Sequence, residues 1–420
     1  MKSGMKRIVT AGIAALASLT MIGSLAACGS DTAASKDLVL TIWGGDVDKT
    51  TMQQRLDLAK KKYPNINVKL QYIAKDYDTK IQTMFSGGTA PDILEIAENV
   101  NAYSTRGQLA DLTSSFPDAK TEFGNANVNA YSYDGKMYAA PDRSAPGVVY
   151  YNKDIFDKAG VEYPSESWDW DTFLTNAQKL VKKDGDTTTQ WAYCEGDWWA
   201  WYMTWMYQNG GRLLDDNGKA TVNSKANVEA MQFYQDLMYK YGVMPKPEQI
   251  TDTGADPLFH QGKLAMEVTG FWNISALQDV DFNWGIAPMW HGKDTAVPMF
   301  SNALAVSSQS KHKDDAIKIV KFLTSKEGQK PIAENALDVP ANLEAAADKS
   351  FTEAKWNKNG LDLSVFSKSQ SMTYAPPFIP KWNQLTQAIS DGMSQTWNGK
   401  QSVKAGLDKA QKTVETALSE

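Results

Sequence analysis

The sequence predicts an α/β protein built as two lobes. A strand, a helix and a second strand follow one another over residues 38–72, an order typical of a parallel sheet covered by helices. From Trp168 onward the chain is richer in helical patterns and aromatic clusters, which indicates a second body. The length of 420 residues is enough for two hydrophobic cores.

The first strand–helix–strand unit is predicted from two kinds of periodicity. Residues 38–43 form a short apolar run that ends at two glycines, which favours a strand. Apolar residues then recur at helical spacing until Pro64, and residues 66–72 alternate between apolar and polar side chains, as strands do. A third strand is predicted at residues 93–97, after a turn signal.

The second half of the chain contains further strand and helix patterns. Residues 263–268 and 303–307 are strand-like. Residues 316–323 carry an apolar stripe opposite Lys and Asp side chains, which is typical of an amphipathic helix. Residues 403–418 have the same spacing and predict a final helix.

The N-terminus has the pattern of a secretory signal. A short basic segment precedes an apolar run over residues 8–27, which ends in Leu-Ala-Ala before Cys28. This ending resembles the bacterial lipobox, in which the cysteine is acylated and becomes the first mature residue. We therefore predict a signal peptide at residues 1–27, a lipid on Cys28, a tether at residues 28–37, and a place on the outer face of the cell membrane. An ordinary transmembrane anchor is the alternative.

Composition and charge exclude several classes of protein. The net charge of −6, which falls to about −9 once the basic leader is removed, argues against a nucleic-acid partner. If Cys28 carries a lipid, Cys194 has no cysteine to pair with, so disulfides do not stabilise the fold. Three separated histidines and two cysteines do not form a His/Cys metal site, and no cofactor is expected.

The sequence gives little support to catalysis. It contains neither a Gly-x-Ser-x-Gly motif nor a Walker-type phosphate loop. Carboxylates cluster at three places, namely Glu195 with Asp197, Asp169 with Asp171, and Asp215 with Asp216. A glycoside hydrolase needs two carboxyl groups that face each other across a cleft, whereas sequence neighbours more often cap helices or lie in turns. We predict that the protein is not an enzyme and keep an exported glycoside hydrolase as an alternative.

Tryptophan gives a stronger signal. Five of the 14 tryptophans lie in residues 191–205, mixed with carboxylates. Sugars present apolar C–H faces that pack on flat rings, and hydroxyl groups that bind Asp, Asn, Glu or Arg. Trp198 and Trp199 stand beside an acidic residue at a helix start and are predicted site residues. Trp201 and Trp205 continue at helical spacing and are predicted to be core.

Several segments together carry a family resemblance. Besides the lipobox, they are Leu-Thr-Ile-Trp-Gly at 40–44, Gly-Thr-Ala-Pro-Asp-Ile at 88–93, Asp-Gly-Lys-Met-Tyr-Ala-Ala-Pro at 134–141, Tyr-Tyr-Asn-Lys-Asp-Ile-Phe at 150–156 and Gly-Lys-Leu-Ala-Met at 262–266. In this order and spacing the chain resembles the extracellular sugar-binding lipoproteins of ABC importers, the family-1 solute-binding proteins to which maltose-binding protein belongs. The resemblance extends over nearly the whole mature chain.

The resemblance implies a two-lobe, periplasmic-binding-protein-like fold with ligand clamped between lobes joined by hinge crossovers. It places the crossovers near residues 146–150, near 300–303 and around 345–360. The implied lobes are residues 38–147 with 300–348, and residues 148–299 with 349–420. Independently, α/β sheets bind ligands at the carboxyl ends of their strands, where the topology switches.

The resemblance also implies a set of ligand-binding residues. They are Trp43, Gly44, Asp46, Glu98, Asn99, Arg143, Ser144, Asp197, Trp198, Trp199, Trp272, Asn273 and Trp382. Other roles stay open for several of them. Glu98 and Asn99 are also suited to a helix cap, Arg143 to a surface salt bridge, and Trp272 and Trp382 to the core.

The predicted function is capture of an oligosaccharide by a membrane-tethered, monomeric receptor that passes it to the transmembrane subunits of an ABC permease. Lobe closure on the bound sugar is the predicted mechanism, without chemical change. The alternatives are the hydrolase, the same fold with a non-sugar solute such as a polyamine, and a lipoprotein that only makes protein contacts.

Overall fold

The structure is a computed structural model that describes residues 36–419 except 197, 251–253, 371, 375, 377 and 378. The predicted signal peptide and Cys28 lie outside the described residues. The last two residues of the predicted tether belong to the first strand, which therefore begins earlier than expected. Within the described part of the chain, no helix has the length and apolarity needed to cross a membrane.

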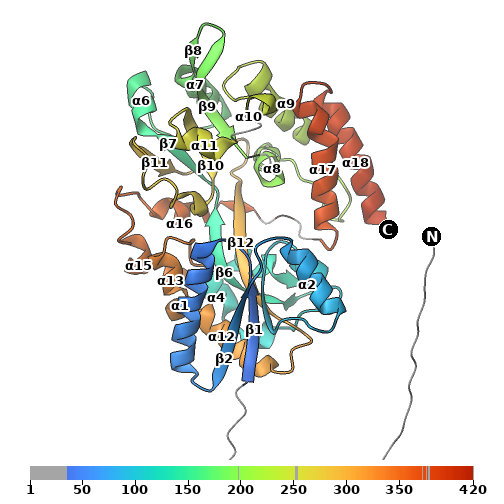
Figure 1. The fold of residues 1–420 in the computed structure, drawn as a ribbon. Helices are drawn as coiled ribbons and strands as arrows, with labels where there is room; N and C mark the ends of the chain where they lie inside the picture. Colours follow the sequence, from blue (N-terminus) through green and yellow to red (C-terminus); the bar gives the residue numbers. More distant parts are fainter. Residues whose placement is uncertain are drawn as a thin grey trace, which may run out of the picture. The chain divides into compact units, whose positions relative to one another are not determined.

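The first sheet has the strand order β13-β12-β3-β1-β2, and β6 also pairs with β12. Figure 1 labels β1, β2, β6 and β12 of this sheet. Its strands are β1 (Lys36–Ile42), β2 (Ile66–Tyr72), β3 (Ile93–Ile96), β6 (Ala139–Pro146), β12 (Val297–Val306) and β13 (Thr373–Tyr374). β1 runs parallel to β2 and β3, whereas β12 runs antiparallel to β3 and β6. The strands predicted near residues 38, 66, 93 and 303 are thus confirmed.

The second sheet has the strand order β11-β7-β10-β9-β8. Its strands are β7 (Val148–Asn152), β8 (Lys182–Asp184), β9 (Thr187–Glu195), β10 (Leu264–Thr269) and β11 (Trp284–Ala287). β9 and β10 are parallel, and β7 is antiparallel to β10 and β11. β4 (Ser132–Tyr133) and β5 (Lys136–Met137) form a small hairpin apart from both sheets.

Helix α1 (Asp46–Lys62) connects β1 to β2 and shows why the first unit folds as predicted. Asp46 and Asp48 lie in its first turn and three lysines in its last, which suits the helix dipole. Its buried side chains include Met52 and Leu56, which pack with the apolar residues of β1. Parallel β1 and β2 with α1 between them form the predicted βαβ unit.

The other helices follow in chain order. They are α2 (Tyr77–Ser86), α3 (Val100–Ser104), η1 (Thr113–Ser115), α4 (Ala119–Phe123), α5 (Asn125–Ala130), α6 (Lys153–Ala159), α7 (Trp170–Leu180), α8 (Trp199–Gln208), α9 (Lys225–Tyr239), α10 (Pro247–Ile250), α11 (Ala255–His260), η2 (Phe271–Asn273), α12 (Lys313–Leu323), α13 (Lys326–Glu334), α14 (Leu343–Ala346), α15 (Lys349–Thr352), α16 (Ser364–Gln370), α17 (Trp382–Trp397) and α18 (Val403–Ser419). α12 and α18 confirm the two amphipathic helices predicted there, and α17 and α18 lie side by side (Figure 1).

Each sheet has its own hydrophobic core. The first sheet is buried on both faces, because alternate residues of β12, such as Leu304 and Ala305, belong to different apolar clusters. The second sheet packs against a larger aromatic core that includes Trp201 and Trp205. Both tryptophans are almost fully buried, which confirms the prediction that they are core.

The chain passes from the first sheet to the second at Gly147, between β6 and β7. The Gly147 N–H donates to the carbonyl oxygen of Pro298 on β12 at 2.9 Å. A Cβ at this position would lie 2.9 Å from the Pro298 ring, so a larger residue does not fit without movement. This contact holds Pro298 of β12 next to Gly147, where the chain passes from the first sheet to the second.

Candidate functional site

A cavity of about 730 Å³ is lined by residues on or next to the strands of the first sheet and by residues that follow β9 and β10 of the second sheet, and we call it the cleft. This volume is in the range of sites that bind small molecules. Seven of the predicted site residues line the cleft, namely Trp43, Glu98, Asn99, Arg143, Trp198, Trp199 and Trp272.

The cleft residues follow the carboxyl ends of parallel strands. Trp43 comes directly after β1, and Glu98 follows β3, which is parallel to β1. In the second sheet, Trp198 follows β9, and Trp272 follows the parallel strand β10. Parallel strands bring their carboxyl ends to one edge of a sheet, which explains why residues far apart in sequence meet here.

Three rings form one side of the cleft, and we call them the aromatic wall (Trp198, Phe300 and Trp272). Phe300 stacks on Trp198 with ring centroids 5.1 Å apart, and Trp272 meets Phe300 edge to face at 5.0 Å. Trp198 is 37% exposed and Trp272 43% exposed, so both keep a large aromatic surface available to a ligand. This exposure contradicts the alternative that Trp272 is a core residue.

Another aromatic pair lines the cleft from the first sheet. Trp43 contacts Tyr77 of α2 edge to face, with ring centroids 4.8 Å apart. The Tyr77 hydroxyl donates to the carbonyl oxygen of Glu95 at 2.9 Å, which fixes the ring against the end of β3. Both sheets therefore contribute flat apolar surfaces to the same cavity.

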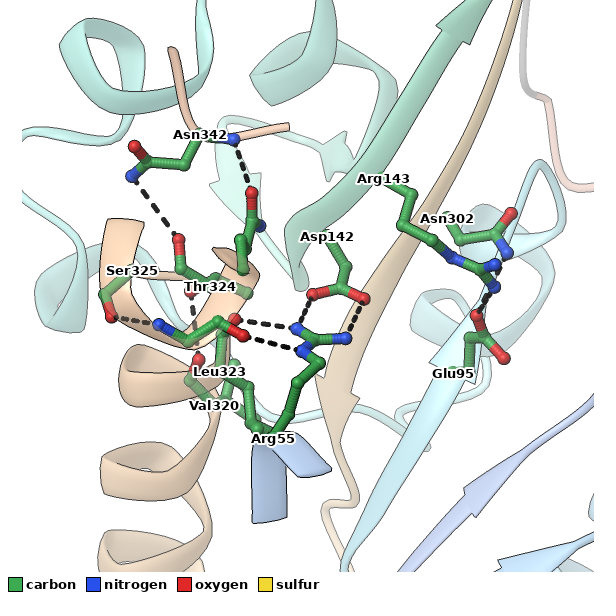
Figure 2. A network of polar contacts seen from close by, with 12 residues as sticks. Arg55, Glu95, Asp142, Arg143, Asn302, Val320, Leu323, Thr324, Ser325 and Asn342 are labelled. Carbon is green, nitrogen blue, oxygen red and sulfur yellow. Dashed lines mark hydrogen bonds and ion pairs between the residues drawn. The ribbon is translucent and has the colours of Figure 1, made fainter. Parts of the chain in front are cut away.

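Arg143 on β6 belongs to a hydrogen-bonded polar group that we call the floor of the cleft (Asp48, Glu95, Arg143 and Asn302). Its guanidinium donates to Asp48 at 2.7 Å. It also donates to Glu95, which accepts from the Asn302 amide at 3.0 Å as well (Figure 2). The Trp43 N–H donates to the other Glu95 oxygen at 3.2 Å. Arg143 is 7% exposed, and its ion pairs with Glu95 and Asp48 are buried and partly buried respectively, in contrast to the surface salt bridge considered as its alternative role.

The electrostatics of this group follow from burial. Burial raises the pKa of Glu95, although Arg143 and the Asn302 amide oppose the shift. Burial alone would lower the pKa of Arg143, but the neighbouring carboxylates, led by Glu95 and Asp48, raise it above its ordinary value. Arg143 therefore stays charged and held by its neighbours.

Beside this group, Arg55 of α1 and Asp142 of β6 form a buried ion pair (Figure 2). Arg55 donates to Asp142 through both terminal nitrogens, one of them at 2.9 Å, and to the carbonyl oxygens of Gly328 and Leu323. The pair joins α1, β6 and the end of α12 directly behind Arg143. It lies outside the cleft lining and holds the floor in place.

Carboxylates are frequent in the cleft. Among the described lining residues they are Asp48, Asp76, Asp78, Glu98 and Asp338. Burial raises the pKa of Glu98, and nearby Asp78 adds to the shift. Burial also raises the pKa of Asp338 to about 7, against the opposing effect of Arg143. Carboxylates and amides at the edge of flat rings can accept hydrogen bonds from hydroxyl groups of a ligand.

The structure does not place every predicted residue in the lining. The Gly44 carbonyl accepts from the Tyr72 hydroxyl, and Asp46 is exposed at the start of α1. Ser144 is fully buried on β6. Asp197 lies outside the described residues.

Two further predicted residues lie behind the lining. Asn273 is buried next to Trp272, donates to Glu267 at 3.1 Å and contacts the His260 ring at 2.9 Å. Trp382 is 2% exposed and meets Trp199 edge to face, with ring centroids 4.9 Å apart. Neither residue lines the cavity: Trp382 packs against the lining residue Trp199, and Asn273 is bonded to buried Glu267.

Other lining residues were not predicted from the sequence. They include Tyr77, Asp78, Phe300, Asn302, Asp338 and Asn383. A signal existed for Phe300 and Asn302, because the family resemblance places a crossover near residues 300–303. In the structure these two positions are half-buried within β12. Asp338 and Asn383 belong to irregular or helical segments that only the fold brings to the cleft.

The chain has clear similarity to known proteins. Residues 45–330 match the family model described as bacterial extracellular solute-binding protein. The galactooligosaccharide-binding protein of Bacillus subtilis is 24% identical over 407 residues, which is 93% of each chain. The maltooligosaccharide ABC transporter solute-binding lipoprotein of Streptococcus pneumoniae is 25% identical over 438 residues, which is 99% of each chain.

Solved structures are similar as well. An ABC substrate-binding protein from Listeria monocytogenes in complex with cycloalternan superposes with a TM-score of 0.81 at 27% identity, over 92% of this chain and 99% of that one. The similarity confirms the predicted fold class, an α/β fold with two lobes. Among the described residues, no group of His, Cys, Asp and Glu is arranged to hold a metal ion.

Proposed function

Because the chain belongs to the bacterial extracellular solute-binding proteins, we propose that it captures an oligosaccharide in the cleft for ABC-type import. Membership confirms the family that the sequence resembles and the prediction of a binding protein rather than a glycoside hydrolase. The relatives in Bacillus subtilis and Streptococcus pneumoniae are named for oligosaccharides, which supports the same class of ligand here.

The observation that carries the proposal is the aromatic wall with polar groups at its edge. Trp198 and Trp272 keep more than a third of their surface exposed, and Asn99 and Asn302 line the same cavity. A pyranose ring packs its apolar face on such a ring and directs its hydroxyl groups to amides and carboxylates in the plane. The cavity volume of about 730 Å³ has room for more than a single small solute.

A thermal-shift screen tests the proposal. Purified protein lacking residues 1–27 is mixed with a library of oligosaccharides, and a sugar present at about 100 times its Kd adds about 2.7 kcal/mol to the free energy of unfolding. We expect at least one oligosaccharide to raise the Tm. The proposal is wrong if no sugar raises it while an amine or a metal ion does.

The aromatic wall gives a matched test of the site. Trp198→Ala and Trp272→Ala each remove a central stacking surface, and we expect the affinity for the sugar to fall about tenfold or more with the fold retained. Tyr133→Ala serves as the control, because Tyr133 is 36% exposed on the β4–β5 hairpin, outside the cleft lining. Unchanged affinity in both tryptophan variants would reject this site.

Closure of the lobes on the sugar is part of the proposal. Lining residues come from both sheets, so a bound sugar gains its full set of contacts only when both sides reach it, and this shifts the population to the closed form. Release to the transmembrane subunits of the permease would complete the cycle. Small-angle scattering with and without sugar should detect a decrease in the radius of gyration.

We also propose that the mature protein is a monomeric lipoprotein on the outer face of the cell membrane. The Leu-Ala-Ala-Cys28 ending and the polar residues after it support this, as does the lipoprotein name of the streptococcal relative. Labelled palmitate should be incorporated in cells, and Cys28→Ala should abolish the label and release the protein to the medium. Light scattering of the soluble form tests whether it is a monomer, and a gel-shift assay tests the absence of nucleic-acid binding.

A further inference from the structure

The charge of the cleft restricts the class of sugar that it can bind, given the proposed function. We propose that the cleft is a charge filter, which binds oligosaccharides bearing an amino group best, uncharged ones next, and those bearing carboxylate, sulfate or phosphate groups least. This order goes beyond the general affinity for oligosaccharides, because aromatic stacking alone does not distinguish these charges.

The first step is the imbalance of charge in the lining. Asp48, Asp76, Asp78, Glu98 and Asp338 line the cleft, whereas Arg143 is the single Lys or Arg among its described lining residues. A cavity lined mainly by one sign of charge attracts the opposite sign and repels its own, the more so when its walls are of low dielectric.

The second step is that the charge of Arg143 is already matched. Its guanidinium donates to Asp48 at 2.7 Å and to Glu95, and both carboxylates are held within the floor. An anionic ligand would have to displace one of them, which would leave buried Glu95 or partly buried Asp48 without its partner. Arg143 is therefore not available to a uronate or a sulfate.

The third step concerns the cations outside the cleft. A neighbouring hollow of about 400 Å³ shares Asp78 with the cleft and is lined also by Arg106 and Lys381. Arg106 donates to the Gln82 side chain at 3.0 Å, and the Lys381 ammonium donates to the Ala417 carbonyl at 2.7 Å. Neither side chain lines the cleft, and each already donates a hydrogen bond to a neighbouring group.

The fourth step identifies where an amino group gains most. Within the described part of the chain, no lysine or arginine forms an ion pair with Asp78, Glu98 or Asp338. Burial and Asp78 raise the pKa of Glu98, so a cation placed beside these two carboxylates relieves their repulsion. The end of β3 and the start of α2 thus form the expected position of the ammonium group.

The experiment uses matched sets of sugars, so that linkage and size are held constant. Cellotriose, maltotriose and a galactotriose are each compared with their 6-amino-6-deoxy, 6-carboxy and 6-carboxy methyl ester derivatives by calorimetry at low salt and pH 8, above the raised pKa of Asp338. We expect the carboxylate to bind about tenfold more weakly than its parent and the amine to bind more tightly than the parent; an amine that binds no better than the parent would contradict the proposed order. The methyl ester should recover most of the lost affinity, because it carries no charge. It is larger than the acid, so this recovery would exclude a steric cause.

A charge-deleted protein provides the second measurement. Asp78→Asn combined with Glu98→Gln should reduce the preference for the amine over the carboxylate about threefold or more. Asp157→Asn, an exposed position on α6 outside the lining, should leave the preference unchanged. Equal binding of carboxylate and parent, or an ester as weak as the acid, would overturn the charge filter while leaving sugar binding intact.

Spermidine separates the failure of this inference from that of the proposed function. If spermidine binds in the cleft and no sugar does, the oligosaccharide function is wrong and the preference for positive charge is supported. If neither the sugars nor spermidine bind, both proposals are rejected.

Discussion

Trp199 and Trp382 are in edge-to-face contact, but only Trp199 lines the cleft. Trp382 is 2% exposed at the start of α17 and therefore acts on the cleft through its neighbour. Trp272 and Asn273 are adjacent in sequence and also differ in exposure: Trp272 lines the cleft, whereas Asn273 is buried and bonded to Glu267.

The Trp199–Trp382 pair leads to a prediction at the residue scale. Trp199→Ala should lower sugar affinity about tenfold, because it removes part of the lining. Trp382→Phe should lower the free energy of unfolding by about 1–3 kcal/mol, because it leaves a void in the core, and should change affinity little. Calorimetry and urea unfolding measure the two effects. Loss of affinity in Trp382→Phe with stability unchanged would mean that Trp382 contacts the ligand.

The buried ion pair behind the cleft gives a second residue-scale prediction. Arg55→Met should lower the free energy of unfolding by about 3–5 kcal/mol, because the Asp142 carboxylate is left buried without its partner. Adding Asp142→Asn should restore part of the loss, which a double-mutant cycle in urea will measure. Lys404→Ala breaks an exposed pair on α18 and should have no measurable effect. If Arg55→Met and Lys404→Ala lowered the free energy of unfolding equally, burial of the Arg55–Asp142 pair would not matter to stability.

At the scale of elements, β12 connects the two halves of the site. Its C-terminal half pairs with β3, residues 299–305 pair with β6, and Phe300 and Asn302 in its half-buried middle line the cleft. Phe300 contacts Trp198, Trp201 and Trp272, which lie in segments that follow β9 and β10 of the second sheet. Movement of the second sheet relative to β12 must therefore change the aromatic wall.

The contribution of the Phe300 ring to sugar binding can be measured by substitution. Phe300→Ala removes the ring that stacks on Trp198, a contact worth about 1 kcal/mol, and affinity for the sugar should fall roughly fivefold. Phe300→Tyr keeps the ring and should retain affinity. Calorimetry on both variants, with circular dichroism as the check of folding, makes the comparison. Tighter binding by Phe300→Ala would mean that the Phe300 ring occupies the place of the sugar.

The same elements show what could be predicted from the sequence. The strand–helix–strand unit at β1, α1 and β2 was predictable, because its periodicities are local and its strands pair in chain order. The residues after β1, β3, β9 and β10 could be placed in a site, because the ends of parallel strands meet. The sequence could not separate Trp272 from Asn273, since a short 3₁₀ turn decides which side chain faces the cavity. Asp338 and Asn383 reach the cleft only through contacts distant in sequence.

At the scale of the whole molecule, buried carboxyl groups dominate the response to pH. Burial raises the pKa of Glu195 and of Asp338 to about 7, and it also raises the pKa of Glu95, Glu98 and Glu267. Glu195 lies in the second sheet and accepts from the Tyr193 hydroxyl and the Trp205 indole. Carboxyl groups whose pKa is raised by burial are thus present in both sheets.

The sign of the effect follows from proton linkage. Between about pH 4.5 and pH 7 the unfolded chain has released protons that the folded protein still holds on Glu195 and Asp338, so the free energy of unfolding falls as the pH rises. Hydrogen bonds lower the pKa of half-buried Asp348 to about 2, and those of Asp111, Asp169 and Asp408 are also lowered. Their contribution to stability is lost only in more acidic solution, so they do not offset the trend.

We therefore predict that the protein is more stable near pH 5 than near pH 8, which urea unfolding across this range will measure. Glu195→Gln removes one of the titrating groups and should make the dependence on pH shallower between about pH 5 and pH 7. Glu344→Gln, at an exposed position on α14, is the control and should keep the original slope. A stability that rises with pH over this interval would mean that the buried carboxyl groups are ionised in the folded protein and held by partners.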